Sequence, residues 1–213
     1  ALPGHTFKVV ALDGNPVPHP AEVPVLWIGT AERVSAIVEM NRPGVWVLGD
    51  TTDSDREGGM GIVVEYVGAT GKPQWQPPPK FMWDYRLFAD PKRKPPTPDE
   101  VIDMVITARQ SGKEGFDVYA INGVPFDMQT MPVMHKLKLG HRYRLRFRNA
   151  SGDIHPLHLH RHTFELVNLH GSPTAGVMKD EVDFTADMPG LTLFHCHMQQ
   201  HMDYGFMALF ETV

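Results

Sequence analysis

The chain has 213 residues, 42% of them hydrophobic, and a formal net charge of −5 at pH 7. This length can bury one large core or two small ones, and the sequence contains no apolar run of about 18 residues that would suit a membrane span. With a net negative charge and no long basic tract, there is no electrostatic basis for binding nucleic acid or a membrane surface, and we expect neither as a partner.

The first third of the chain predicts short β-strands. Runs rich in valine and aromatic residues, bounded by glycine, proline, asparagine and aspartate, recur at the spacing of a β-sandwich. They cover residues 6–12, 23–28, 34–40, 44–49 and 61–68. After the first run, Asp13-Gly14-Asn15-Pro16 predicts a turn, because glycine and asparagine tolerate positive φ and proline cannot continue a ladder.

Two proline-rich stretches interrupt this pattern. Residues 71–80, GKPQWQPPPK, predict a linker because their prolines have no N–H to donate. We therefore expect a domain boundary near residue 78, with one β unit over 1–78 and another over 79–213. The second stretch, 90–100, is expected to be a surface excursion.

The second unit is also predicted to be all-β, with little helix. Ile102, Met104 and Ile106 alternate with polar or smaller residues, which is the period of a half-buried strand. Further strand-like runs cover residues 116–123, 135–140, 143–150, 163–170, 181–186 and 190–197. A helical period of 3.6 residues is not sustained anywhere in the sequence.

Cysteine content and the first residues do not identify a cellular compartment. Cys196 is the only cysteine, so no internal disulfide can form. The opening residues ALPGHTFKVV lack the basic start and the long apolar stretch of a signal peptide. Either the protein has none or it precedes this chain.

Candidate chemistry is concentrated in two strings. HPLHLHRHTF (155–164) and HCHMQQH (195–201) together hold seven of the twelve histidines and the only cysteine. If the chain is extended around Cys196, alternate side chains point to opposite faces, so His195 and His197 share the face away from Cys196. One strand would then serve two sites.

The same alternation divides the first string. His158 and His160 share a face, while His155 can lie on the opposite one. His155, Cys196 and His201 then form a set of two imidazoles and one thiolate, which is the trigonal ligand shell of a blue-copper site for one-electron transfer.

The other four histidines form two His-x-His pairs, whose nitrogens suit copper, zinc or iron. They are His158, His160, His195 and His197. Because two of them adjoin Cys196 in the sequence, an electron on a thiolate-bound copper would reach either one through a few bonds.

Two other chemistries fit these residues less well. A structural zinc site usually draws on two or more cysteines, and a cysteine hydrolase would not explain the pair His158 and His160. His162 is expected to be a packed or hydrogen-bonding residue. The remaining histidines are treated as background: His5, His19, His135, His141 and His170.

The two strings resemble the copper-binding signatures of the C-terminal cupredoxin domain of multicopper oxidases, the family of laccases, ascorbate oxidase and bacterial cuproxidases. Residues from about 80 onward are similar to that last domain, and LPGHTFKVVALDGNPVPHP through GMGIVVEYVG is similar to the later part of a middle domain. The resemblance implies cupredoxin-like Greek-key β-sandwiches, one partial over 1–78 and one nearly complete over 79–213.

The resemblance also implies ligands and an activity. His155, Cys196 and His201 would hold a type 1 copper that takes electrons from a small-molecule reductant. The other four histidines would be half the ligands of a type 2/type 3 trinuclear copper cluster that reduces dioxygen to water. These ligands are His158 for the type 2 ion and, for the type 3 pair, His160, His195 and His197. A periplasmic or secreted location is implied as well.

One departure from the family pattern concerns the cluster. In that family it takes eight histidines, four of them from an N-terminal domain that this chain does not contain. We therefore expect an N-terminal half with two His-x-His motifs, either as a separate chain or as a segment missing here. The complete enzyme would hold four copper ions.

Three further departures are local. Family members usually carry another strand and turn between the equivalents of Asp180 and Glu181, so residues are expected to be either missing or truly deleted there. The axial position of the type 1 copper falls on Phe206, which cannot ligate, so we expect a three-coordinate copper with a raised potential. If that alignment is wrong, Met207 is the neighbour. Arg161 stands where many relatives carry glycine.

The substrate is the least determined property. Laccase-like oxidation of phenols or aromatic amines is the leading interpretation. A metallo-oxidase acting on Cu(I) or Fe(II) is the alternative, because Met128, Met131 and Met134 recur at close spacing and thioethers suit Cu(I). These methionines also fit ordinary packing. A blue-copper electron-transfer module without oxygen chemistry is a third reading.

Overall fold

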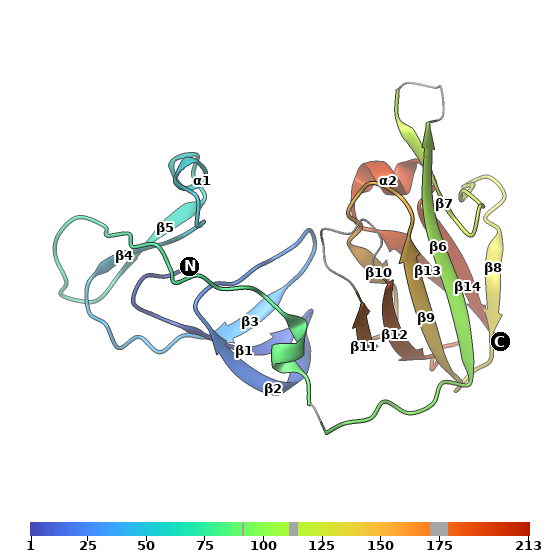
Figure 1. Ribbon diagram of the computed structural model, residues 1–213, viewed down its shortest axis with the longest axis horizontal. Coiled ribbons are helices and arrows are strands. Elements are labelled where there is room, and N and C mark those ends of the chain that lie inside the picture. Colours follow the sequence, from blue (N-terminus) through green and yellow to red (C-terminus); the bar gives the residue numbers. More distant parts are fainter. Residues whose placement is uncertain (91, 111–114, 171–178) are drawn as a thin grey trace. The chain divides into compact units, whose positions relative to one another are not determined.

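Strands dominate the computed structural model, which describes residues 1–90, 92–110, 115–170 and 179–213 (Figure 1). Helix in this part of the chain is limited to α1 (Asp53–Glu57), α2 (Gln199–Asp203) and the 3₁₀ turn η1 (Tyr85–Phe88). The prediction of an all-β chain with little helix is confirmed. Among these residues, the structure has no helix with the length and apolar character needed to cross a membrane.

The chain divides into two compact units, of which the first comprises Ala1–Arg93. Its strands are β1 (Phe7–Leu12), β2 (Asn15–Val23), β3 (Val34–Ile37), β4 (Val45–Gly49) and β5 (Gly61–Glu65). The first three form a sheet in the order β2-β1-β3, and β4 and β5 form a hairpin. The core of this unit consists of Leu2, Phe7, Val9, Val23 and Phe88.

The boundary between the units follows Arg93, not residue 78 as the proline-rich stretch suggested. Phe88 is fully buried in the first core, and Phe81 and Trp83 pack against it. These aromatic side chains attach the segment after the prolines to the first unit. The proline-rich stretch follows the last strand of this unit, but the sequence pattern did not predict that the residues after it pack on the same core.

Strand β2 was not predicted, because it contains three prolines. Asp13 and Gly14 form the expected turn with φ values of 50° and 82°, and β2 begins directly after it. Pro16, Pro18 and Pro20 are two residues apart, so their missing N–H groups all lie on one side of the strand. β2 is an edge strand, where that side needs no ladder hydrogen bond. Conversely, the run predicted at 23–28 is a strand only at its first residue.

The second unit, Lys94–Val213, is a sandwich of two sheets. Its strands are β6 (Glu100–Gln110), β7 (Asp117–Ile121), β8 (Val133–Leu137), β9 (Arg142–Asn149), β10 (Leu157–Leu159), β11 (Phe164–His170), β12 (Lys179–Thr185), β13 (Gly190–Cys196) and β14 (Met207–Thr212). One sheet has the order β10-β13-β14-β8, and the other has the order β11-β12-β9-β6-β7. The pairs β6/β9 and β14/β8 are parallel, and the others are antiparallel.

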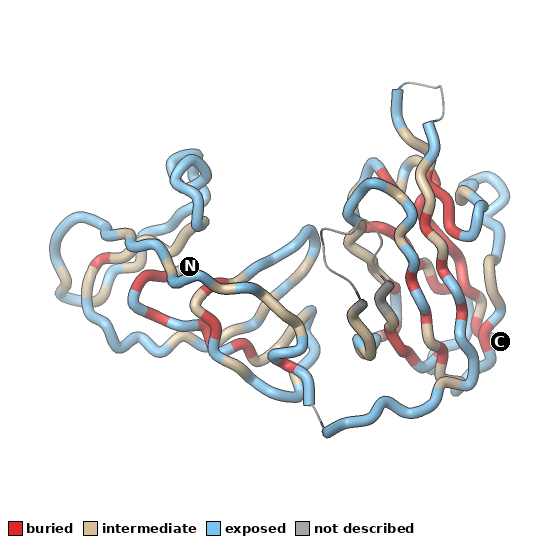
Figure 2. The backbone as a smooth tube through the Cα atoms, in the orientation of Figure 1, coloured by how far each residue is buried: buried red, intermediate tan, exposed pale blue. Residues whose placement is uncertain are grey.

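The core of this unit lies between the two sheets, and buried positions recur along their strands (Figure 2). Ile102, Met104 and Ile106 are 7%, 0% and 2% exposed, which confirms the predicted alternation of β6. Cys196 and Phe206 belong to the same core and are both fully buried. The sheet that carries the two histidine strings therefore places Cys196 in the core between the sheets.

The position at which residues are expected to be missing or deleted, between Asp180 and Glu181, falls within β12. Asp180 pairs there with Leu169 of β11, and Glu181 pairs with Asn168. Residues 171–178, which connect the two strands, lie outside the described residues, as do the side chains of Lys179 and Asp180. The expectation that residues are missing or deleted here stays a prediction.

Candidate metal centre

The register between β10 and β13 places the two histidine strings side by side. Leu157 pairs with Cys196, and His158 pairs with His195. Directly opposite residues of an antiparallel pair lie on the same face, so neighbouring positions alternate between the core and the outer face. This alternation separates the candidate ligands into two groups, as the sequence predicted.

The first group consists of His155, Cys196 and His201, whose donor atoms converge. The Nδ1 atoms of the two histidines are 3.1 Å apart, and the Cys196 Sγ lies 3.8 Å from Nδ1 of His155 and 3.5 Å from Nδ1 of His201. Cys196 and His201 are buried, and His155 is half-buried. Three elements supply these side chains: the loop before β10, the end of β13, and α2.

The orientation of His155 is fixed by its second ring nitrogen. Nε2 lies 2.6 Å from the hydroxyl of Ser151, which itself donates to Oδ1 of Asn149 at 2.7 Å. A serine hydroxyl has one proton, so this arrangement favours donation from Nε2–H of His155 to Ser151. The lone pair of His155 then lies on Nδ1, facing the sulfur. Burial, with a smaller effect of His201, lowers the pKa of His155 to about 4, so the ring is neutral near pH 7.

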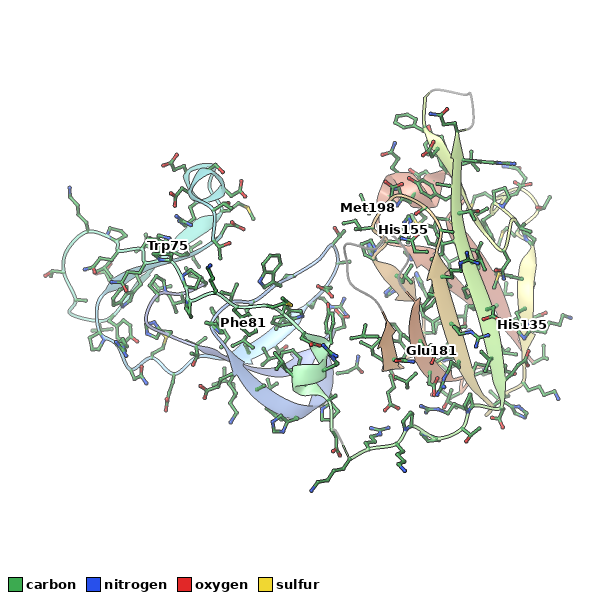
Figure 3. The ribbon with its side chains drawn as sticks, viewed as in Figure 1. Trp75, Phe81, His135, His155, Glu181 and Met198 are labelled. Carbon is green, nitrogen blue, oxygen red and sulfur yellow. The ribbon has the colours of Figure 1, made fainter. Side chains whose placement is uncertain are left out.

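Cys196 lies in a protected environment. Burial raises the pKa of its thiol, although the N–H of Met198 donates to the sulfur at 3.5 Å and opposes that rise. Met198 and His155 lie at the α2 end of the second unit (Figure 3). A metal that binds this sulfur must displace its proton, so binding here is linked to proton release.

The second group consists of His158, His160 and His195. One nitrogen from each lies within 4.8 Å of the others, and the Nε2 atoms of His160 and His195 are 2.9 Å apart. Nδ1 of His195 lies 2.8 Å from the backbone oxygen of Cys196, which makes Nδ1 the protonated atom and leaves the Nε2 lone pair facing His160. Burial, together with His195 and His197, lowers the pKa of His160.

His197 and His162 lie beside this group in different ways. The ring of His197 is exposed, with its centroid 5.5 Å from that of His158 and 5.4 Å from that of His195, but its donor atom is outside the tight set of three. His162 is buried and bonds through Nδ1 to Asp187 at 2.9 Å. The prediction that His162 is a packed, hydrogen-bonding residue is confirmed.

Phe206, the residue predicted for the axial position, lies beside the first group. Its ring is fully buried, and its centroid is 4.7 Å from the His155 ring. Its backbone closes the site, since its carbonyl accepts from the N–H of Cys196 at 3.2 Å and its N–H donates to the carbonyl of His201 at 2.9 Å. Met207 follows it as the first residue of β14.

Tyr119, in β7, is the residue at this site that the sequence did not reveal. Its ring centroid lies 4.2 Å from that of His201 and 5.6 Å from that of His155. It comes from the opposite sheet of the sandwich, nearly 80 positions before the second string, and no spacing rule connects the two. Only the folded structure could place it there.

Arg161 adopts a backbone conformation that favours glycine, and its side chain makes two hydrogen bonds there. Its φ is 63°, in the left-handed region that glycine adopts without steric cost. The guanidinium donates to the carbonyl oxygens of Leu191 at 3.0 Å and Pro189 at 2.9 Å. These two bonds attach the turn after His160 to the start of β13.

The methionines of the metallo-oxidase alternative do not form one exposed patch. Met128 and Met131 are 63% and 48% exposed, whereas Met134 packs against the core of the second unit. No observation at these residues favours Cu(I) handling over ordinary packing and surface exposure.

The donor chemistry of both groups fits copper. A thiolate with two imidazoles is a soft, three-donor set of the kind copper selects, and imidazole nitrogens alone also suit copper. The structure brings together the three predicted ligands of the first group and three of the four predicted for the second. His197 is adjacent to them.

Comparison with known proteins identifies the family of this chain. The family described as multicopper oxidase matches residues 91–213 with one of its models and residues 1–64 with another. A multicopper oxidase of Mycobacterium tuberculosis is 32% identical over all of this chain. The chain belongs to the multicopper oxidase family, and its strands form the cupredoxin-like sandwich of that family.

The chain spans about half the length of such relatives. It covers 43% of the mycobacterial protein and 39% of bilirubin oxidase from Albifimbria verrucaria, to which it is 27% identical over 96% of its residues. The laccase from Botrytis aclada superimposes with a TM-score of 0.72 over 99% of this chain and 48% of its own, at 17% identity.

Gly205 allows the backbone to approach the first group closely. Its φ is 102°, and a Cβ there would lie 2.7 Å from the carbonyl oxygen of Tyr119. We expect Gly205→Ala to lower the free energy of unfolding by about 3 kcal/mol, because backbone strain and steric overlap add. Gly140 is the control: its φ is 83° with nothing within 4 Å, and Gly140→Ala should cost only about 1 kcal/mol.

Denaturant unfolding of both variants measures this difference. Equal losses of stability would contradict the close contact with Tyr119 and leave positive φ as the only cost.

Proposed function

We propose that this chain is the C-terminal part of a laccase-like oxidase that couples one-electron oxidation of phenols or aromatic amines to the reduction of dioxygen. Four substrate molecules would each lose one electron and one proton, and one dioxygen would take up four of each to give two waters. The observation that carries this proposal is the continuity of the two donor groups: Cys196 belongs to one group, and its neighbour His195 belongs to the other.

The residues divide the work between two sites. His155, Cys196 and His201 would hold the type 1 copper, and His158, His160, His195 and His197 would supply half of the trinuclear cluster, with His158 on the type 2 ion. Bound copper would supply reversible one-electron chemistry at both sites. The polypeptide between Cys196 and its flanking histidines provides a short covalent path between them. Tyr119, Phe206 and neighbouring core residues exclude water from the buried sulfur.

An N-terminal half is part of this proposal. His160 and His197 are exposed in this chain, although their neighbour His195 is buried. Such a half-buried group of histidines is suited to completion by ligands from another domain, and the relatives are about twice as long. We infer from the family resemblance that the complete protein acts in the periplasm or outside the cell.

Copper content per copy of this chain tests the completed cluster. We expect four copper ions in a preparation that reduces dioxygen: one at the first group and three at a cluster shared with the N-terminal half. Electrophoresis should show that half as a second polypeptide or as part of a longer chain. One copper per chain with no oxygen uptake would instead indicate an electron-transfer module. A single species of this chain's mass that reduces dioxygen would refute the need for a partner.

Substitution at each group separates the two sites. Cys196→Ser should abolish both the blue absorption and oxygen uptake, because it removes the thiolate from the site that accepts electrons. His158→Ala should keep the blue absorption and reduce oxygen uptake to background. The measurements are visible absorption and oxygen consumption on copper-loaded protein. If both variants behaved alike, the division into two sites would be wrong.

Phe206→Met tests the proposed axial position. A thioether close to the copper should stabilise Cu(II), lowering the reduction potential by roughly 60 mV, which is a tenfold change in the one-electron equilibrium. Phe210→Met is the control, because Phe210 is equally buried but packs on Phe194 in the core. A redox titration that shows no difference between the two variants would assign Met207 as the neighbour of the metal instead.

A further inference from the structure

Tyr119 lies on the sheet opposite β13 and contacts both histidines of the first donor group. It is 6% exposed, and its ring lies over that of His201 at an interplanar angle of 34°. The ring meets His155 edge-on, at 80°. It offers no ligand atom to the group, because its hydroxyl points elsewhere.

The hydroxyl of Tyr119 bonds to the loop that carries His155. It donates to Oδ2 of Asp153 at 2.7 Å, and Asp153 is two residues before His155. The same loop contains Ser151, whose hydroxyl orients the His155 ring and donates to Asn149 at the end of β9. One side chain thus packs on one histidine and tethers the segment that positions the other.

The backbone of Tyr119 is held equally firmly against α2. The N–H of Tyr119 donates to the carbonyl oxygen of Tyr204 at 2.9 Å. Because Gly205 has no Cβ, its backbone can lie close to the carbonyl oxygen of Tyr119. Tyr119 therefore has a fixed position relative to the helix that carries His201.

The two histidines differ in what orients them. His155 has a hydrogen-bonded partner at Nε2, whereas His201 has none at Nε2 among the described residues. Metal-bound histidines usually depend on such a partner for ring orientation. At His201, the aromatic contact with Tyr119 takes that place, and offset or tilted ring pairs of this kind are attractive.

We propose that Tyr119 is a positioning residue for the type 1 site: its ring sets the orientation of His201, and its hydroxyl sets the position of the His155 loop relative to that ring. This rests on the proposed function of His155, Cys196 and His201 as copper ligands. It assigns to β7 a part in the copper geometry that neither histidine string contains.

Two substitutions separate the two contacts. Tyr119→Leu removes both the ring contact and the hydrogen bond, and Tyr119→Phe removes only the hydrogen bond. Tyr143→Leu and Tyr143→Phe are the matched controls, because Tyr143 is 1% exposed in the same core and its hydroxyl accepts from the N–H of Lys138 at 2.8 Å. All four are expected to lower thermal stability.

The readouts are the visible and electron paramagnetic resonance spectra of the copper-loaded protein, its affinity for Cu(I), and the ¹⁵N resonances of the His201 ring in copper-free protein. We expect Tyr119→Leu to shift the blue absorption, to weaken Cu(I) affinity about tenfold, and to move the His201 resonances. Tyr119→Phe should produce smaller changes in the same direction. If Tyr119→Leu does not fold, Tyr119→Phe alone decides.

The outcomes distinguish this inference from the proposed function. A blue, copper-binding protein whose spectra, affinity and His201 resonances are unchanged in the Tyr119 variants would overturn the positioning role. Equal changes in the Tyr143 variants would overturn it as well, since they would reflect general loss of core packing. A parent protein that binds no copper at Cys196 would instead overturn the proposed function.

Discussion

The register between β10 and β13 is the constraint on which both donor groups depend. Because His158 lies opposite His195 and Leu157 lies opposite Cys196, each strand sends one residue to the core and the next to the outer face. A shift of one residue would exchange the faces and bring leucine where histidine is needed. Burial of both Cys196 and Leu159 favours this register, since a slip by one residue would turn one of them out of the core.

Burial gives the first group its chemical character. Three donor atoms face one another at hydrogen-bonding distances inside a core from which water is largely excluded. Charging the imidazoles there is opposed by burial, which lowers the pKa values of both His155 and His201. Burial therefore favours two neutral imidazoles and a protonated thiol over a set of ions, so a soft metal that binds here has only the thiol proton to displace.

The sequence was sufficient for the parts of this structure that repeat along one strand. The alternation in β6 and the parity of His195, Cys196 and His197 both follow from the two-residue period of a strand, and the structure agrees with them. Strand β2 was missed because proline lowers strand propensity in general and is harmless at an edge. The boundary after Arg93 and the contact between Tyr119 and His201 were missed for a different reason. Both depend on packing between segments that are distant in sequence, and a local sequence pattern cannot predict such packing.

The left-handed turn at Arg161 bears on how readily an ion that leaves the second group could bind there again. His158 and His160 are attached to β13 by ladder hydrogen bonds on one side and by the guanidinium of Arg161 on the other. Release of an ion from a single flexible histidine needs only a rotamer change, which takes nanoseconds. The exposed ring of His160 can rotate in this way, but the backbone of the two strands stays in register, so an ion that leaves finds the same pair of histidine positions again. A glycine at this position would permit the same turn but would leave one end of the strand pair unfastened.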